Sequence, residues 1–289
     1  MRYGMPFKGS KNSIAEKVID VLPEGSILYD IFGGGGAITH CAVLSGKWQK
    51  VVYNELDPMV FQGFQMAIQG KFKNENRWIS RSDFFRLRRS DPYVAMCFSF
   101  GNDLKTYCYG RDIEKYKKMI HEIVYGDTPR NRLKAYKHFM KECKKIYRNW
   151  TLESLERLER LQSLERLERL QSLGHLERLQ SLGHLERLQS LGHLELSNCD
   201  YADVELSNCD YVIYCDIPYK GTNAYNQDFD YDRFYAWARR QKNIYISSYE
   251  MPNDFECIAT IPRRGNMSAV NKDGIKQEKI FIPIREAEQ

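Results

Sequence analysis

The residues best suited to chemistry stand in two short segments, and the first is built on glycine. Gly33 to Gly36 follow Asp30 at the end of an apolar run, and a second apolar run, 50–54, ends just before Glu55. Glycines let a backbone approach a ligand closely, and the helix expected after them offers unpaired N–H groups. An acidic residue about 20 positions further on can accept both hydroxyls of a ribose. The pattern predicts a strand–helix–strand unit that binds a nucleoside, without distinguishing NAD from S-adenosylmethionine, and the missing Gly-Lys-Ser/Thr ending argues against ATP hydrolysis.

The second segment, Asp216-Ile-Pro-Tyr219, follows an apolar run, 211–215, that is typical of a buried strand. It would lie at the carboxyl end of the sheet, where open α/β folds bind ligands. A planar exocyclic amine that attacks a methyl sulfonium needs acceptors for its two hydrogens. The carboxylate of Asp216 can be one acceptor, and the carbonyl of Ile217 can be the other because Pro218 restricts the local backbone. The ring of Tyr219 offers a face on which an extruded base can stack.

In this order, with a basic stretch between them, the two segments resemble the Dam-type family of DNA N6-adenine methyltransferases, particularly its phage-encoded members. The resemblance covers most of the chain except its middle. It departs from the family at Ser10, where a second glycine is expected, and at Ile217, which replaces the first proline of Asp-Pro-Pro-Tyr. Because only the carbonyl of Ile217 is expected to act, its side chain is compatible with activity, although a less rigid turn could lower turnover. The resemblance implies that the catalytic residues are Asp216, Ile217, Pro218 and Tyr219, and that the cofactor-binding residues are Phe7, Lys11, Asp30, Phe32, Gly34, Gly36, Glu55, Asp200 and Tyr201.

The fold implied by this resemblance is α/β. It is the Rossmann-like sheet of S-adenosylmethionine-dependent methyltransferases, with an inserted, mainly helical recognition domain and a leucine-rich nonapeptide repeat. The core would comprise residues 1–70 and 194–289, the recognition domain 71–150 and the repeat 151–193. The implied reaction moves a methyl group from S-adenosyl-L-methionine to the amino nitrogen of a flipped adenine in double-stranded DNA. Three alternatives stay open: the same reaction on RNA adenine, an NAD-dependent oxidoreductase, and a catalytically inactive DNA-binding homologue.

Positive charge is concentrated in one stretch. The 289-residue chain has a formal net charge of +5, but Arg111 to Arg148 alone holds 12 Lys/Arg against 5 Asp/Glu, an excess of 7. Such a face can neutralise phosphates, although the solvated face of an amphipathic helix has a similar pattern. A smaller arginine cluster at 81–89 could approach phosphates or base edges. The predicted DNA-binding residues are Arg81, Arg88, Lys141, Lys144 and Lys145.

The cysteines give no sign of a metal site. All eight are scattered, and none forms a Cys-x-x-Cys pair. A signal peptide and an apolar run long enough to cross a bilayer are both missing, so we expect a cytoplasmic protein without a membrane partner. There is also no Pro-Cys nucleophile of the kind that attacks a cytosine ring carbon, which favours direct transfer to an amine. The sequence does not indicate an oligomeric state.

A nine-residue repeat occupies Ser154 to Glu195. Its first copies read Ser-Leu-Glu-Arg-Leu-Glu-Arg-Leu-Gln, and later copies replace the first Glu-Arg by Gly-His. Leucine at every third position fits no straight α-helical face, because at about 100° per residue the stripe drifts by about 60° per leucine. The composition nonetheless favours a helix, which Gly174, Gly183 and Gly192 would weaken, and a stacked solenoid is the alternative. Equivalent histidines nine residues apart on a helix would be separated by about 13.5 Å, too far to share a metal.

A second duplication follows the repeat. Residues 195–201, Glu-Leu-Ser-Asn-Cys-Asp-Tyr, recur as 205–211. Either Asp200 or Asp210 could therefore hold the adenine of the cofactor. The gap before the catalytic strand favours Asp200, because Asp210 directly precedes that strand.

Three further segments complete the expected architecture. Residues 243–249 predict a core strand whose end, Ser247 to Tyr249, resembles a family segment that lines the target-base pocket. Residues 279–284 predict a last strand at the edge of the sheet, because Pro283 cannot donate to a ladder of hydrogen bonds. Asp91-Pro-Tyr93 shares residues with the catalytic motif but has no apolar strand before it, so we interpret it as a turn.

Overall fold

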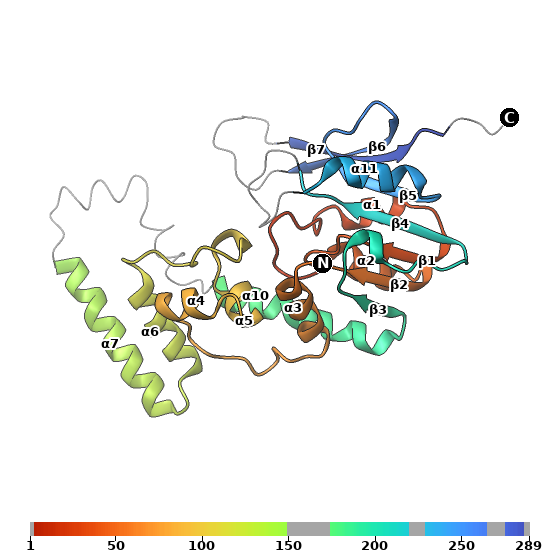
Figure 1. Cartoon of the computed structure of the whole chain (residues 1–289). Coiled ribbons are helices and arrows are strands. Elements are labelled where there is room, and N and C mark those ends of the chain that lie inside the picture. The colour runs from red at the N-terminus through yellow and green to blue at the C-terminus, as the bar shows by residue number, and fades with distance from the viewer. Residues whose placement is uncertain (1–2, 149–173, 220–228, 265–274, 286–289) are drawn as a thin grey trace. The chain divides into compact units, whose positions relative to one another are not determined.

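The computed structural model describes residues 3–148, 174–219, 229–264 and 275–285 (Figure 1). The chain divides into two compact units. Met1–Lys73 and Ser181–Gln289 form the first unit, and Asn74–Gln180 form the second. The first unit therefore already includes the end of the repeat, which we expected to lie outside the core.

The first unit is built on a seven-stranded mixed sheet. The strands follow the order β3-β2-β1-β4-β5-β7-β6, in which β1 to β5 are parallel and β7 runs antiparallel between β5 and β6. The expected α/β fold is confirmed. The strands are β1 (Gly25–Asp30), β2 (Trp48–Asn54), β3 (Leu194–Ser197), β4 (Tyr211–Asp216), β5 (Ile244–Ser248), β6 (Phe255–Arg264) and β7 (Ile275–Pro283).

The predicted position of the last strand is wrong. β7 is not at the edge, because it hydrogen-bonds to β5 on one side and to β6 on the other. Pro283 is tolerated there because it is the last residue of the strand. The edge is β6, which itself contains Pro262.

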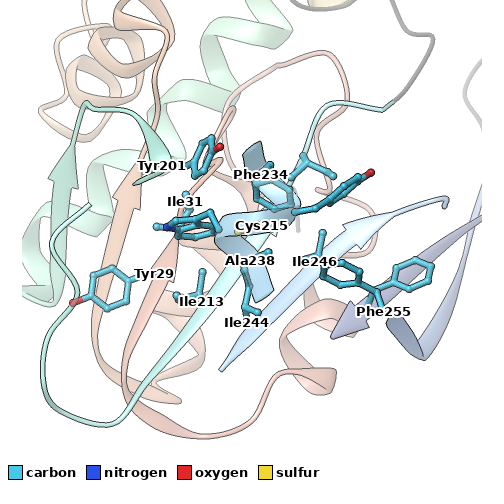
Figure 2. Close-up of a cluster of buried hydrophobic side chains, with 14 of the residues drawn as sticks. Tyr29, Ile31, Tyr201, Ile213, Cys215, Phe234, Ala238, Ile244, Ile246 and Phe255 are labelled. Atoms are coloured by element: carbon cyan, nitrogen blue, oxygen red, sulfur yellow. The ribbon is translucent and has the colours of Figure 1, made fainter. Parts of the chain in front are cut away.

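Helices cover the sheet and bury both of its faces, as a parallel sheet requires. α2 (Ala37–Ser45) packs on β1 and β2, and α1 (Ala15–Val21) packs on α2. Figure 2 shows part of the buried apolar cluster that includes Phe234 of α11 (Tyr231–Arg240), Ile213 of β4 and Ile246 of β5. Full burial of an apolar side chain of this size contributes about 1.5–3 kcal/mol to stability. This cluster anchors the strands whose ends carry the predicted site.

The strand register brings the predicted site residues to one end of the sheet. Asp30, the last residue of β1, pairs with Tyr53 of β2 and with Tyr214 of β4. Asp216, the last residue of β4, pairs with Ser247 near the end of β5. Because these strands are parallel, their carboxyl ends lie along the same edge of the sheet.

The described part of the repeat forms two kinds of helix. α10 (Gly174–Gly183) is α-helical, whereas η2 (His184–Leu191) is a 3₁₀-helix that ends at Gly192 with a φ of 67°. A 3₁₀-helix has three residues per turn, so every third residue lies on one face. In η2, Leu185 and Leu188 are buried, as is Leu182 near the end of α10, whereas Leu191 is exposed. η2 is neither an α-helix nor a stacked solenoid, in a part of the repeat where the glycines were expected to weaken a helix. The earlier copies lie outside the described residues.

The second unit is mainly helical in its described residues. An aromatic core surrounds Trp78, which stacks on Tyr109 with ring centroids 5.7 Å apart and lies edge-on to His175 of the repeat. The helices of this unit are α4 (Arg81–Leu87), α5 (Pro92–Cys97), the 3₁₀ turn η1 (Phe100–Asn102), α6 (Glu114–Tyr125), α7 (Pro129–Arg148) and most of α10.

His175 is fully buried and lies inside a chain of hydrogen bonds that runs from Tyr109 to Asn76. The Nε2 of His121 lies 2.9 Å from the carbonyl of Asn76 and must donate to it, which leaves Nδ1 of His121 as an acceptor. His175 therefore donates from Nε2 to that Nδ1 over 3.0 Å, and its own Nδ1 accepts from the hydroxyl of Tyr109 over 2.7 Å. Burial lowers the pKa of His175 to about 3, so both imidazoles are neutral at physiological pH. One Gly-His copy of the repeat thus supplies a core residue of the second unit.

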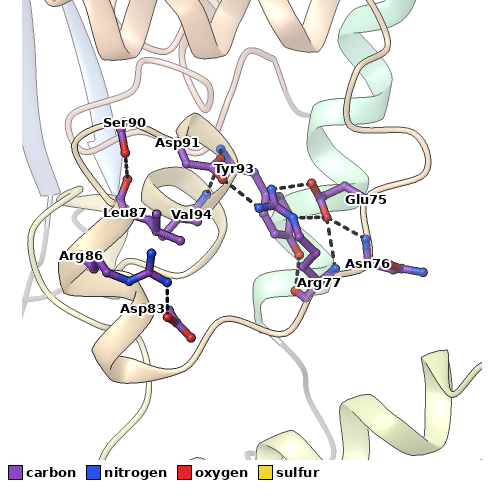
Figure 3. Close-up of polar contacts among 10 residues, drawn as sticks. All are labelled: Glu75, Asn76, Arg77, Asp83, Arg86, Leu87, Ser90, Asp91, Tyr93 and Val94. Carbon is purple, nitrogen blue, oxygen red and sulfur yellow. Dashed lines mark hydrogen bonds and ion pairs between the residues drawn. The ribbon is translucent and has the colours of Figure 1, made fainter.

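Asp91 begins a helix of this unit instead of forming the expected turn. Its carboxylate accepts from the backbone N–H groups of Tyr93 and Val94, as an N-terminal cap of α5 does (Figure 3). Arg77 donates to the other carboxylate oxygen of Asp91 over 2.9 Å and also pairs with Glu75. Asp91-Pro-Tyr93 is therefore structural.

Two deletions of 18 residues isolate the contribution of His175. Removal of Ser154–Gln171 or of Ser163–Gln180 takes out two copies each, and the products differ only in Gly-His versus Glu-Arg at the position of His175. We expect the second deletion to be less stable by about 1–3 kcal/mol, because Tyr109 and His121 lose a buried partner. Thermal unfolding of both proteins measures the difference.

The matched control makes the same Gly-His to Glu-Arg change at Gly183 and His184, where the histidine is exposed. It should leave the unfolding midpoint nearly unchanged. Equal midpoints for the two deletions would show that His175 does not stabilise the second unit.

Candidate active site

A pocket of about 410 Å³ lies at the carboxyl ends of β1, β2 and β4. The strand order reverses between β1 and β4, and open α/β sheets bind ligands at such a switch point. All the predicted cofactor residues except Gly36 line this pocket. Asp216 and Pro218 of the predicted catalytic segment line it too, whereas Ile217 and Tyr219 do not. The fold thus joins the two segments in one site.

The glycine loop needs its glycines for packing as well as for the approach of a ligand. Gly36 precedes α2 with a φ of 69°, and a Cβ there would lie 2.2 Å from the ring of Phe64. A Cβ on Gly33 would lie 2.2 Å from the ring of Tyr53. Gly36 therefore turns the chain into α2 without lining the pocket, which corrects its predicted role as a ligand contact.

Glu55 lies beside the glycine loop, as the sequence predicts for an acceptor of ribose hydroxyls. Its Oε2 accepts from the N–H of Gly34 and its Oε1 from the N–H of Asp57, both over 2.8 Å. Burial raises the pKa of Glu55 to about 7, although these two hydrogen bonds oppose the shift. The side chain is therefore partly protonated at neutral pH, and its charge responds to what enters the pocket.

Asp30 ties the end of β1 to the first turn of α2. Its Oδ2 accepts from the backbone N–H of Thr39 over 3.1 Å and from the Thr39 hydroxyl over 2.6 Å. The residue is 1 % exposed, and burial raises the pKa of its carboxyl to about 7. Asp30 lines the pocket, but its described contacts hold the glycine loop in place.

One wall of the pocket is aromatic. Phe32, Tyr201 and Phe229 pack against one another with ring centroids 5.6–6.3 Å apart. Arg233 of α11 lies over the ring of Tyr201 at 5.1 Å. The hydroxyl oxygen of Tyr201 is buried and has no hydrogen-bond partner among the described residues.

The duplication is resolved by position: Asp200 lines the pocket and Asp210 does not. Both carboxylate oxygens of Asp200 accept from Arg233, over 2.9 and 3.0 Å, and Oδ1 also accepts from the N–H of Ala202. Asp210 lies before β4, where its backbone carbonyl accepts from the N–H of Ser26. Only the first copy is therefore placed to contact a ligand.

Lys11 links the cofactor motif to the catalytic segment. Its Nζ donates to Oδ1 of Asp216 over 2.5 Å and to the hydroxyl of Tyr219 over 2.6 Å, and it lies 3.7 Å from Oε2 of Glu278. Lys11 is only 2 % exposed, whereas the side chain of Asp216 is 21 % exposed toward the pocket. The sequence predicted that Lys11 binds the cofactor; its two nearest described partners, Asp216 and Tyr219, belong to the predicted catalytic segment.

Tyr219 is held at two points. Its hydroxyl donates to Glu278 over 2.9 Å, and its ring stacks on Tyr249 with centroids 4.3 Å apart. Burial and the neighbouring carboxylates raise the pKa of Tyr219 far above its ordinary value, so the phenol stays protonated. The sequence predicted that the ring of Tyr219 offers a face on which a base can stack; Tyr249 covers one of its two faces.

The turn between Asp216 and Tyr219 is anchored on both sides. The side chain of Ile217 is 2 % exposed and packs into the apolar cluster of Figure 2. The carbonyl of Pro218 accepts from the hydroxyl of Tyr231 over 2.9 Å. The isoleucine that departs from the family pattern is therefore accommodated by the core and does not enter the pocket.

Sequence reasoning missed two charged residues of the site, Arg233 and Glu278. The sequence does contain an indication of Glu278. In β7 it lies on the same side of the strand as the fully buried Ile280, where a charged residue is unexpected. Arg233 left no such signal, since it lies on an exposed helix turn and is recognisable only by its partner Asp200.

The predicted DNA-binding residues fall into different surroundings. Arg81 pairs with Glu114, donates to the carbonyl of Tyr109 and lies over the ring of Tyr107, so its contacts are structural. Arg88 lies over the ring of Phe85 at 5.6 Å. Lys141 is exposed on α7, and the side chains of Lys144 and Lys145 lie outside the described residues.

An exposed basic stripe nevertheless runs along α7. Its members recur at helical spacing on one face: Arg130, Lys134, Lys137 and Lys141. Lysines of α6 are engaged instead, since Lys117 is buried and Lys118 lies 3.9 Å from Glu122. The charge excess of this region is therefore presented mainly by α7.

Membrane spans and metal clusters are both missing from the described residues. No helix in them is long and apolar enough to cross a membrane. Nor do they contain a group of three or more histidine, cysteine, aspartate or glutamate side chains placed to hold a metal ion.

Comparison with known proteins adds a distant structural likeness. No family model and no curated protein matches the chain. Among solved structures, it is similar to the rRNA methyltransferase AviRa from Streptomyces viridochromogenes, at 12 % identity over 94 % of this chain and 82 % of that chain, with a TM-score of 0.38. A likeness of this degree carries no inference about reaction or substrate, which are inferred from the site alone.

The raised pKa of Glu55 predicts that ligand affinity depends on pH. The carboxylate accepts hydroxyls better than the protonated acid, so S-adenosylmethionine should bind more tightly as the pH rises from 6 to 8 through the pKa of about 7. Calorimetric titration across this range measures the trend.

Glu55→Gln should bind more weakly and lose most of the pH dependence, with a penalty of roughly 2–3 kcal/mol for the lost charged hydrogen bonds. Glu256→Gln, which removes an exposed carboxylate of β6 that does not line the pocket, is the control and should keep the wild-type affinity and pH profile. A variant Glu55→Gln that keeps the wild-type affinity and pH profile would remove Glu55 from the ligand site.

Proposed function

We propose that this chain is an S-adenosylmethionine-dependent methyltransferase that acts on the amino nitrogen of an adenine in DNA. The observation that carries the proposal is that Asp216, at the start of the Asp-Ile-Pro-Tyr segment, lines the same pocket as Glu55 and the glycine loop. A nucleoside cradle and an acceptor for an amine hydrogen thus share one cavity.

The residues of the pocket fit this cofactor. A volume of about 410 Å³ suits a nucleoside with an amino-acid side chain, and ligand pockets of this class span about 300–1,000 Å³. Glu55 would accept the ribose hydroxyls, the N–H groups of the glycine loop would face the ligand, and Tyr201 would lie against its adenine beside Asp200. When bound, the cofactor supplies an electrophilic methyl group on a sulfonium.

The catalytic segment would orient the amine. Asp216 would accept one hydrogen of the amino group, and the carbonyl of Ile217 would accept the other, so that the nitrogen lone pair points at the methyl group. The anchoring of Ile217 in the core and of Pro218 by Tyr231 keeps these acceptors in a fixed geometry. Lys11 donates a hydrogen bond to Oδ1 of Asp216 and so helps to fix the orientation of that carboxylate.

An oxidoreductase is less well supported. Hydride transfer from a hydroxyl needs a group that takes up the released proton, most often a histidine. The described residues that line the pocket include no histidine. The buried histidines of the second unit, His121 and His175, are engaged with each other.

Double-stranded DNA is the proposed partner because the stripe on α7 matches a phosphate backbone. Arg130, Lys134, Lys137 and Lys141 span about 16 Å along the helix at 1.5 Å per residue. Charges spaced in this way can contact several phosphates in succession. All four side chains are exposed, which leaves the stripe accessible to a partner.

Methylation of nucleic acid by Asp216 variants tests the reaction. Asp216→Ala should lower kcat by roughly 100-fold or more, because one of two acceptors of the amine is lost, while cofactor affinity changes little. Incorporation of labelled methyl groups into DNA and RNA, with mapping of the product base, measures it.

The duplicated segment provides the control pair. Asp200→Ala should weaken cofactor binding, whereas Asp210→Ala, the same change in the second copy, should not. Transfer to RNA alone would replace the DNA assignment, and a wild-type protein that binds cofactor and DNA without transfer would be an inactive homologue.

The salt dependence of DNA binding tests the partner. Arg130→Gln/Lys134→Gln/Lys137→Gln should weaken binding and reduce the slope of log K against log salt by about 0.9 for each phosphate that the variant no longer neutralises. Fluorescence anisotropy with a DNA duplex at several salt concentrations measures both quantities. Lys118→Gln, which removes a lysine already close to Glu122, is the control; a triple variant with the wild-type slope would show that the stripe is only solvated surface.

A further inference from the structure

Glu278 is a completely buried carboxylate next to the catalytic segment. It is 0 % exposed, and its partners among the described residues include Ser247, Tyr219 and Lys11. Ser247 donates to its Oε1 over 2.7 Å, Tyr219 lies 2.9 Å from Oε1 and 3.0 Å from Oε2, and Lys11 lies 3.7 Å from Oε2. A buried charge with this many polar contacts is costly to build, so it calls for a reason beyond packing.

Lys11 lies between two carboxylates that differ in surroundings. Asp216 is the nearer partner at 2.5 Å and faces the pocket, while Glu278 at 3.7 Å is sealed in the sheet. In the proposed reaction Asp216 must turn an oxygen to the amine of the target base. An ammonium that is 2 % exposed would then lose much of its counter-charge unless a second carboxylate stayed beside it.

We propose that Glu278 is a positioning residue of the transfer reaction. It keeps the ammonium of Lys11 paired while Asp216 engages the amine, and it holds the hydroxyl of Tyr219 so that the tyrosine stays fixed beside the base. This inference rests on the proposed methyltransferase function. Glu278 acts through Lys11 and Tyr219 and does not itself line the pocket.

The strand register fixes the position of Glu278 relative to Asp216. Ser247, its hydrogen-bond donor, pairs with Asp216 across β4 and β5 and with Ile280 across β5 and β7. Three neighbouring strands therefore set the distance between Glu278 and Asp216. Tyr249, two residues beyond Ser247, stacks on the ring of Tyr219 and so restricts the position of that ring.

Glu278→Gln tests the inference because it keeps the shape and removes the charge. The amide oxygen can still accept from Ser247 and Tyr219, but the amide nitrogen would face Lys11, whose remaining carboxylate partner in the described part of the chain is Asp216. We expect kcat for methyl transfer to fall by about 10- to 100-fold, because Asp216 would be misplaced relative to the amine. The Kd for S-adenosylmethionine should stay within a few-fold of wild type. Glu256→Gln, an exposed carboxylate on β6, is the control for loss of one charge from this sheet.

A double variant shows whether the effect passes through Lys11. If it does, the loss of kcat in Lys11→Met/Glu278→Gln should be smaller than the product of the two single losses, because the part that passes through Lys11 is already gone. Multiplicative losses in kcat would overturn the inference, as would a Glu278→Gln enzyme with wild-type kcat. If Glu278→Gln fails to fold, Ser247→Ala replaces it: this variant removes one hydrogen bond to Glu278, and an unchanged kcat would overturn the inference equally.

A measurement without turnover separates this inference from the proposed function. In protein labelled with ¹⁵N-lysine, the Nζ resonance of Lys11 is the one that disappears in Lys11→Met. It should shift in Glu278→Gln and not in Glu256→Gln. A wild-type protein that methylates no nucleic acid would refute the proposed function, whereas an unshifted Lys11 resonance would refute the pairing with Glu278 whatever the activity.

Discussion

A buried ammonium group needs a counter-charge at every moment, because an unpaired ion in a protein interior costs several kcal/mol. Lys11, in the amino-terminal segment, is such a group, and its two carboxylate partners come from distant parts of the chain: Asp216 from the end of β4 and Glu278 from β7. These contacts join the amino-terminal segment to the turn that begins at Asp216 and to β7, which pairs with β5 and β6 inside the sheet.

Carboxyl groups gather at one end of the sheet. Asp30, Glu55 and Asp216 all line the pocket, and burial raises the pKa of the first two to about 7. Partial protonation limits the repulsion between them at neutral pH. A cationic ligand would favour their ionised forms, so its binding and the release of protons are linked. A pocket of this kind is suited to a positively charged nucleoside.

The repeat shows how a simple period can serve two local structures. Two copies have the same nine residues, 172–180 and 181–189; the described residues of the first, 174–180, are α-helical, whereas 184–189 of the second belong to a 3₁₀-helix. In the 3₁₀-helix Leu185 and Leu188 share a face and are buried. In the other copy His175 lies inside a buried hydrogen-bond chain, whereas the equivalent His184 is exposed. Surroundings, and not the copy's sequence, decide the role.

What the sequence determined was local. The ends of β1 and β4, the turn into α2 and the position of Glu55 are encoded by residues close together in the chain, namely apolar runs, glycines and a proline. The predicted elements agree with the structure there. Partners that lie far apart were decided only by the order of strands in the sheet: Lys11 and Asp216 are 205 positions apart, and Tyr219 and Glu278 are 59 apart. For the same reason Arg81 could not be recognised as structural without Glu114, nor Arg233 as a pocket residue without Asp200. Local chemistry is written in neighbouring residues, whereas a buried charge is satisfied by whichever distant residue the fold brings to it.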